Sequence, residues 1–139
     1  MSEENKAIMR RFVDEYQTGR EEAVADELLA DGFVNHADVP GIPNDKLGVK
    51  ILFAGFHRAF PDFRAEIHDQ VAEGDRVVTY KTFHGTHRGE LWGIPPTGRE
   101  VAFDLIDIVR MRDGQIAEHW NVVDQMGLMQ QLGVAPGAA

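Results

Sequence analysis

The hydrophobic pattern of this chain changes its period at Pro61, and no other feature constrains the fold as strongly. Before Pro61 apolar residues recur at helical spacing, whereas after it they recur in four strand-like segments. Helices followed by hairpin-linked strands predict an α+β fold: a cone-shaped, curved antiparallel sheet with the N-terminal helices over its concave face. Such a fold leaves a pocket for a small molecule between sheet and helices. We expect helices at 2–18, 21–29, 45–60 and 125–132, an extended segment at 33–36, and strands at 64–72, 76–86, 100–112 and 115–123.

Chain length and charge narrow the class of protein. With 139 residues the chain has room for one domain, assigned to 1–139, with 134–139 as a disordered tail. The formal net charge of -9 argues against binding to nucleic acid or to an anionic membrane, because both need a basic footprint. The sequence has neither a signal-peptide pattern nor an apolar run long enough to span a membrane, so the expected compartment is the cytoplasm.

The sequence offers little that could hold a metal or an organic cofactor. It contains no cysteine, which excludes a thiolate nucleophile and a Cys-ligated metal site. It also lacks a phosphate-binding loop and a dinucleotide-binding fingerprint. His84 and His87 flank Gly85, but no carboxylate accompanies them at a fixed metal-ligand spacing. We therefore expect no metal and no cofactor.

The last hairpin decides which polar side chains share a face of the sheet. A two-residue turn at 113–114 would place Asp107 opposite Trp120. A three-residue loop at 112–114 would instead place Asp107 opposite His119. Hydrophobic periodicity leaves both registers open, because both faces of this hairpin are apolar. The second register gathers the following residues on one face, with Leu105 opposite Asn121: Leu105, Asp107, His119 and Asn121.

In that register Asp107 and His119 form a pair inside an apolar wall. Polar groups there are costly unless they bond to each other or carry a function. A carboxylate fixes the tautomer of a neighbouring imidazole and makes it a better base, which suits proton abstraction or the activation of water. A buried hydrogen bond that only holds the hairpin together would have the same spacing, so both interpretations stay open.

Several motifs carry a resemblance to a known family: GTHRGE at 85–90, GIPPTG at 93–98, DGQI at 113–116, EHW at 118–120 and GLMQQLG at 127–133. On these motifs the chain resembles the SnoaL-like polyketide cyclase family over most of its length. The resemblance implies a cone-shaped α+β barrel of the nuclear-transport-factor-2 or ketosteroid-isomerase type. It also implies ring closure in an aromatic polyketide ester by intramolecular aldol chemistry, without metal or organic cofactor. The register that the resemblance favours is the one that pairs Asp107 with His119.

The resemblance extends to some site residues and not to others. His119 and Asn35 match the family's pocket histidine and asparagine. Asn121, however, stands where characterised cyclases carry the aspartate that acts as acid and base. Asp107 stands where they carry histidine, and Leu105 where they carry glutamine. Because an asparagine cannot exchange a proton at neutral pH, either the base has moved to the Asp107–His119 pair or the chemistry has changed.

The first hypothesis is a polyketide cyclase in which His119 takes a carbon-bound proton and Asp107 orients the imidazole. Asn35 and Asn121 would then hold the developing enolate oxygen. The alternatives are a cofactor-independent hydroxylase, an epoxide-hydrolase-like enzyme of the same fold, and a non-catalytic protein that binds a small molecule. Four further residues are expected to contact the substrate: Tyr80, Trp92, Phe103 and Leu105.

The expected partners are a polyketide-like aromatic small molecule and a second copy of the chain. A homodimer or higher homo-oligomer is expected because the resemblance implies pairing through the convex face of the sheet, and that face is apolar here.

Overall fold

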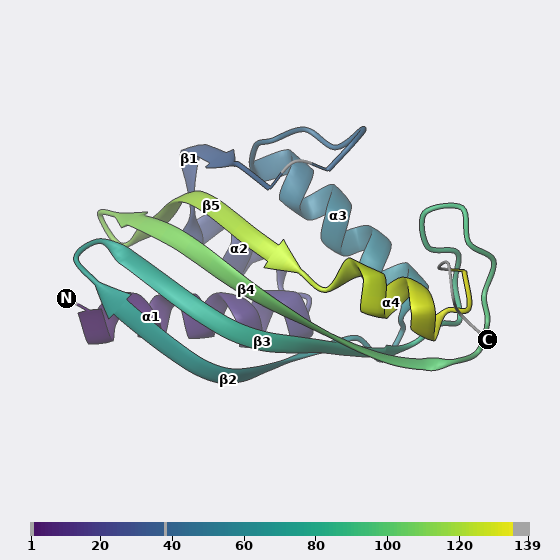
Figure 1. The fold of residues 1–139 in the computed structure, drawn as a ribbon. Coiled ribbons are helices and arrows are strands. Elements are labelled where there is room, and N and C mark those ends of the chain that lie inside the picture. Colours follow the sequence, from purple (N-terminus) through teal and green to yellow (C-terminus); the bar gives the residue numbers. More distant parts are fainter. Residues whose placement is uncertain (1, 38, 135–139) are drawn as a thin grey trace.

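The α+β prediction is confirmed by the computed structural model, which describes residues 2–37 and 39–134 (Figure 1). In chain order the elements are α1 (Ser2–Arg11), the π-helix η1 (Phe12–Thr18), α2 (Glu22–Leu28), β1 (Leu29–Asn35), α3 (Lys46–Ala59), β2 (Arg64–Glu73), β3 (Arg76–Thr86), β4 (Glu100–Arg112), β5 (Gln115–Val123) and α4 (Gln125–Gln131).

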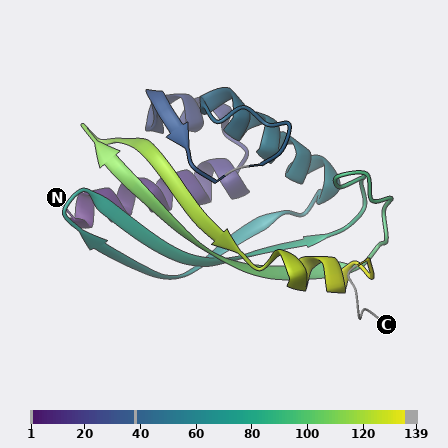
Figure 2. The ribbon, with the colours of Figure 1, turned by 45° about the horizontal axis from the view of Figure 1, so that its top comes forward.

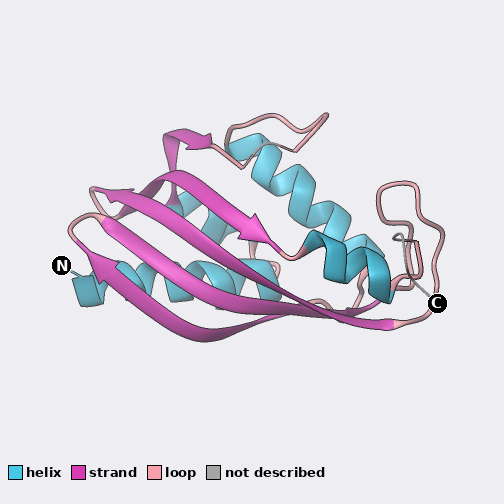
Figure 3. Cartoon of the chain, in the orientation of Figure 1, coloured by secondary structure: helices cyan, strands magenta, loops and turns pink. Residues whose placement is uncertain are grey.

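The five strands form one curved sheet that does not close into a complete barrel, and the helices α1, α2 and α3 lie on its concave side (Figure 2; Figure 3). The strand order is β1-β5-β4-β3-β2. Strand β1 runs parallel to β5, and the other neighbours are antiparallel. No helix in the described part of the chain is both long and apolar enough to cross a membrane.

Most expected elements begin and end within a residue or two of the observed ones. Strand β1 is longer than the extended segment expected at 33–36, because it begins at Leu29 directly after α2. Of the expected tail, residues 135–139 lie outside the described residues. Val134 is described, and its backbone N–H donates to the carbonyl of Met129 at 3.0 Å.

Alternation along the strands separates a buried concave face from an exposed convex face. In β4 the odd-numbered positions from Val101 to Met111 are buried, whereas most even-numbered ones are exposed or half-buried. In β3 the positions that pair with this face include Thr79 and Lys81. The concave face packs against an aromatic cluster in which Phe53 and Phe56 of α3 contact Phe83 of β3. Helix α3 begins at the cap Asp45, whose Oδ1 accepts a hydrogen bond from the backbone N–H of Gly48.

The segment Phe12–Thr18 continues α1 as a π-helix, which the helical spacing of the sequence does not distinguish from an α-helix. Its wider turn is visible at the C-terminal end, where the Gly19 N–H donates to the carbonyl of Asp14. The backbone carbonyl of Gln17 accepts a hydrogen bond from His57 Nε2 of α3 at 2.7 Å. The Gln17 side chain is buried and directed at the sheet, so the π-helix supplies a polar group to the concave side.

The register of the β4–β5 hairpin differs from both registers that the sequence left open. The turn is the two-residue one, with positive φ at Asp113 and Gly114, and it pairs Arg112 with Gln115. One extra residue in β5, Ala117, then shifts the pairing by one. Asp107 consequently faces Asn121.

The expected pairing of Asp107 with His119 as direct opposites is therefore wrong, and so is that of Leu105 with Asn121. His119 faces Val109 instead, and Leu105 faces Val123. The prediction that Asp107, His119 and Asn121 share a face is confirmed, because the turn and the bulge together preserve odd-with-odd pairing.

Candidate functional site

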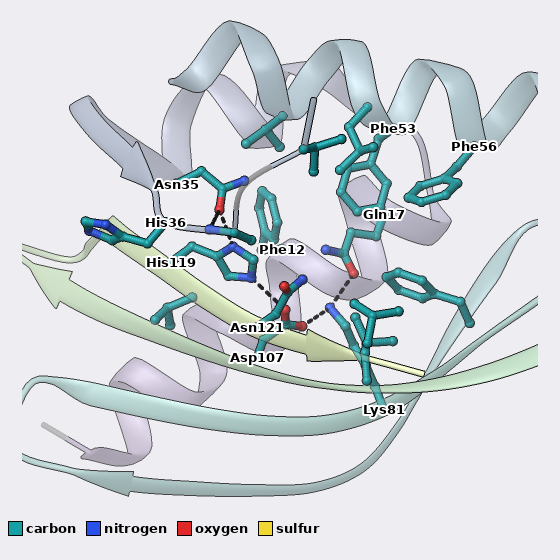
Figure 4. A pocket seen from close by; sticks show the side chains of 18 of the residues that line it. Phe12, Gln17, Asn35, His36, Phe53, Phe56, Lys81, Asp107, His119 and Asn121 are labelled. Atoms are coloured by element: carbon teal, nitrogen blue, oxygen red, sulfur yellow. Dashed lines mark hydrogen bonds and ion pairs between the residues drawn. The ribbon is translucent and has the colours of Figure 1, made fainter. Parts of the chain in front are cut away.

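A cavity of about 660 Å³ lies between the concave face of the sheet and the helices. This size is typical of sites for small organic molecules. Its walls are mainly apolar and aromatic, and its polar side chains gather on the sheet side (Figure 4). The apolar walls include Met9, Phe12, Leu29, Phe33, Val49, Leu52, Phe53, Phe56, Phe83, Phe103, Leu105, Val109, Ile116, Val123 and Leu128.

Five polar side chains from five elements form a continuous chain across this cavity (Figure 4). Gln17 Oε1 accepts a hydrogen bond from Lys81 Nζ at 2.8 Å. Lys81 Nζ lies 2.6 Å from Asp107 Oδ2, and Asp107 Oδ1 lies 2.6 Å from His119 Nε2. His119 Nδ1 lies 2.8 Å from Asn35 Oδ1. We call this set of residues the polar chain.

The hydrogen bonds of Asn35 establish which protons His119 carries. Asn35 pairs with His119 across the parallel strands β1 and β5, and its Oδ1 accepts the backbone N–H of Ala37 at 2.9 Å. A carbonyl oxygen can only accept, so His119 Nδ1 must donate to it. Nε2 faces a carboxylate oxygen at 2.6 Å, so one further proton is shared between His119 and Asp107.

The surroundings of Asp107 keep its carboxyl ionised. Burial by itself would raise the pKa of the Asp107 carboxyl, but the Lys81 ammonium and the His119 ring outweigh it and hold the pKa well below its usual range. Asp107 is therefore held as a carboxylate at neutral pH. Asp107 Oδ2 makes no well-aligned hydrogen bond within the described residues, so its short contact with Lys81 is an ion pair.

Lys81 and Gln17 are site residues that the sequence reasoning missed. Lys81 is 1% exposed and lies over the face of Phe83, with Nζ 5.0 Å from the ring centroid. A signal was present: Lys81 alternates with Val77 and Phe83, and a lysine on an apolar strand face needs a buried partner. The position of Gln17 carried no such signal, because it depends on the π-helix.

Asn121 lines the cavity directly across from Asp107. Among the described residues none forms a hydrogen bond with its side-chain amide, so the amide is available to a ligand. Asn35 also lines the cavity, but its Oδ1 is occupied by Ala37 and His119 and only its Nδ2 is left for a ligand oxygen.

The remaining substrate-contacting candidates divide into two groups. Leu105, Phe103 and Trp92 line the cavity, where Phe103 packs edge-on against Phe83 and Trp92 packs edge-on against Phe56. The prediction that Tyr80 reaches the cavity is wrong. It lies on the convex face, 40% exposed, because the strand alternation that turns Lys81 inward turns Tyr80 outward.

The two histidines considered for a metal site lie apart from the cavity and have other partners. His84 Nε2 lies 2.9 Å from Glu66 Oε1 at the surface. His87 is buried, and its Nδ1 accepts the backbone N–H of Thr97. Within residues 2–37 and 39–134 no three or more histidine and carboxylate side chains are gathered so that they could hold a metal ion.

The sequence of the chain matches a known family and several of its members. The family model described as SnoaL-like polyketide cyclase matches residues 7–132. The chain is 32% identical to the nogalonic acid methyl ester cyclase of Streptomyces nogalater, over 88% of this chain and 92% of that one. It is 31% identical to the aklanonic acid methyl ester cyclase DnrD of Streptomyces peucetius, over 91% of this chain and 88% of that one.

Solved structures of similar fold include TsrD from Streptomyces laurentii, with a TM-score of 0.85 and 29% identity, covering 94% of this chain and 96% of that one. AclR from Streptomyces galilaeus, a candidate hydroxylase, has a TM-score of 0.88 and 28% identity, covering 100% of this chain and 87% of that one.

Proposed function

This chain belongs to the SnoaL-like polyketide cyclase family, and from that premise we propose that it closes a ring in an aromatic polyketide ester by a cofactor-independent intramolecular aldol reaction. Its relatives named as cyclases act on methyl esters of aklanonic and nogalonic acid, and the substrate proposed here is an aromatic methyl ester of that kind. The observation that carries the proposal is the pair of buried Asp107 and half-buried His119, which share one proton. With Lys81 and Asn121 they form the polar floor of an otherwise mainly apolar cavity.

An aldol ring closure requires one proton to leave a carbon and one proton to reach an oxygen. The bond that breaks is the C–H bond beside a carbonyl, and the bond that forms joins this carbon to a second carbonyl carbon. The oxygen of that second carbonyl then takes a proton, so the product has the same mass as the substrate. A pair that starts with one shared proton can accept the proton from carbon and then deliver one to the alkoxide.

The hydrogen bonds favour a division of roles that differs from the sequence-based hypothesis. A base needs a free lone pair, and both ring nitrogens of His119 face acceptors. We therefore assign the carboxylate of Asp107 to receive the proton from carbon and the His119 ring to deliver the shared proton to oxygen. Asn121 would donate to the enolate oxygen from across the strand, while Asn35 keeps the imidazole in place.

A hydroxylase is the second candidate function. It is supported by the similarity to AclR and by the presence of Asn121 where the family resemblance leads one to expect an aspartate. Such an enzyme would add one oxygen to the substrate, and an epoxide-hydrolase-like enzyme would add one water. The product mass separates both from the cyclase.

The test is a mass-spectrometric assay of the purified protein on an aromatic polyketide methyl ester, without added cofactor. We expect a new product of unchanged mass. His119→Ala and Asp107→Asn should each lower kcat/KM by about 10²- to 10⁴-fold while ligand affinity changes only a few-fold. His84→Ala is the matched control, because it removes a histidine from a histidine–carboxylate pair outside the cavity.

If turnover survives both substitutions, Asp107 and His119 do not carry out the proton transfers. A product heavier by one oxygen or one water would replace the cyclase with the second candidate. Saturable binding without any product would leave a non-catalytic binding protein.

A further inference from the structure

The ammonium of Lys81 has more donors than the protein uses. A lysine ammonium carries three N–H donors. Within the described residues Gln17 Oε1 accepts one, and Asp107 Oδ2 lies within ion-pair distance of the Nζ atom. Lys81 also lines the cavity. One N–H therefore remains for an oxygen atom of a bound ligand.

The charges around Lys81 leave the floor of the cavity with an excess of one positive charge. The titratable side chains that line the cavity within the described residues are Lys81, Asp107, His119 and His36. Asp107 and His119 share one proton and are neutral as a pair, so nothing on the cavity side offsets the charge of the Lys81 ammonium. His36 adds nothing on the cavity side, because its Nε2 is paired with Glu118 and its ring stacks on Trp120.

The neutral partner of Lys81 preserves this excess. Gln17 accepts a hydrogen bond from Lys81 but brings no negative charge to compensate the ammonium. The surrounding walls are apolar, so water screens the ammonium poorly. A floor of this kind favours a ligand oxygen that is negatively charged.

From these contacts we propose that Lys81 is a substrate-contacting residue that binds the ionised oxygen of an enol or phenol conjugated to a carbonyl. The proposal rests on the proposed function and deepens it, since an enolate is the intermediate of an aldol ring closure. Planar aromatic ligands fit the site, because Phe83 lies beside the ammonium and Phe53 and Phe56 line the same cavity.

The proposal has a consequence that does not depend on turnover. If the floor stabilises the ionised oxygen, a phenolic ligand must lose its proton at lower pH in the cavity than in water. The probe is 2-hydroxyanthraquinone, whose visible absorption changes when its hydroxyl ionises. We expect the bound dye to have an ionisation constant at least about tenfold larger than the free dye, a shift of one pKa unit.

Two variants isolate the contribution of Lys81. Lys81→Met alone leaves Asp107 buried without its ion-pair partner and risks misfolding. The decisive comparison is therefore the wild type against the double variant Asp107→Asn/Lys81→Met, which contains no unpaired buried charge at these two positions. The single variant Asp107→Asn, in which Gln17 still accepts a hydrogen bond from Lys81, separates the effect of the carboxylate from that of the ammonium. The single variant should keep the enlarged ionisation constant, and the double variant should return it to within about twofold of the value for free dye. Tyr80→Phe, on the opposite face of the same strand, should leave the wild-type shift unchanged.

Three results would overturn the proposal: a dye that ionises no more readily in the wild-type cavity than in water, a shift that persists in the double variant, or a dye that does not bind. The same experiments distinguish a failure of this proposal from a failure of the proposed function. A shifted dye without ring closure would leave the role of Lys81 intact and remove the cyclase, whereas ring closure without a shifted dye would do the reverse.

Discussion

The side chain at position 121 decides how many carboxylates the cavity floor carries. Asn121 lies directly across from Asp107 in the β4–β5 pairing. With an amide at this position, Asp107 is the single carboxylate among the described residues of the cavity, and Lys81 and His119 both engage it. A second carboxylate would lie at cross-strand distance, roughly 5 Å between Cβ atoms, where like charges repel. The amide therefore keeps the floor cationic.

Asn121→Asp should make the stability of the protein depend on pH. A carboxyl fixed at position 121 faces the Asp107 carboxylate directly across the strands, and Lys81 and His119 are already engaged by the oxygens of Asp107. Asp107 is held ionised, so its repulsion should raise the pKa of the new carboxyl above the value of about 3.9 in the unfolded chain. A raised folded-state pKa means that the variant matches the wild type at pH below about 4 and loses stability as pH rises through that raised pKa. We expect a deficit of about 1 kcal/mol at neutral pH.

Urea unfolding of wild type and variant across this pH range would measure the deficit. The same substitution at the exposed Asn44 is the control and should show no comparable trend. A constant difference between Asn121→Asp and wild type at every pH would contradict the argument.

The bulge in β5 is the structural element that brings His119 and Asn121 to the cavity, on the same face as Asp107. The two-residue turn at 113–114 alone would pair Asp107 with Trp120 and turn His119 and Asn121 to the convex face. The extra residue at Ala117 reverses that outcome by shifting the register once. The parallel pairing of β1 then brings Asn35 beside His119.

Deletion of Ala117 should therefore abolish the site. Without the extra residue the register slips by one, His119 and Asn121 leave the cavity, and Trp120 enters it. We expect binding of 2-hydroxyanthraquinone to weaken by at least about tenfold, together with a loss of stability of a few kcal/mol from the misplaced side chains.

Ala117→Gly is the matched control, because it keeps the residue count and should keep the register. Titration of the dye into both variants, with urea unfolding alongside, separates the two cases. Equal binding by the deletion variant and the control would mean that the bulge does not set the register.

The convex face of the sheet leaves an apolar row uncovered in the single chain. Tyr80, Ile106 and Val122 pair with one another across β3, β4 and β5, and they are 40%, 46% and 77% exposed. Neighbouring apolar side chains with this exposure are typical of a protein–protein contact. The homodimer expected from the sequence stays a prediction, and this row is the part of the molecule on which it depends.

In solution we expect a particle of twice 15.5 kDa. Val122→Lys should shift it to the single-chain mass, because a charge at the most exposed position of the row opposes its burial. Leu47→Lys, which replaces an exposed leucine at the start of α3, should leave the mass unchanged. Size-exclusion chromatography with light scattering measures all three proteins. A wild type that runs as a single chain at high concentration would refute the dimer.

The sequence by itself determined the features that depend on local periodicity. The change at Pro61 predicted helices before strands, and the alternation along β4 and β5 limited the choice to two faces for Asp107 and His119. The same alternation groups Phe103 and Leu105 on one face with Asp107, and both line the cavity. These features are encoded by neighbours within a few residues, so they can be read without the folded chain.

Only the tertiary structure decided the features that depend on distant contacts. The bulge at Ala117 sets the register of β5 against β4. The sequence could not choose this register, because both faces of the hairpin carry apolar residues. The assignment of Tyr80 to the cavity was wrong because the face of β3 is set by its pairing with β4. Gln17 reaches Lys81 only through the wide turn of η1. The backbone N–H of Ala37 donates to Asn35 Oδ1, which identifies this atom as an acceptor. His119 Nδ1 must therefore carry the proton in its hydrogen bond to the same oxygen. Strand pairing and hydrogen bonds between residues far apart in the sequence determine these features. Patterns among neighbouring residues do not predict them.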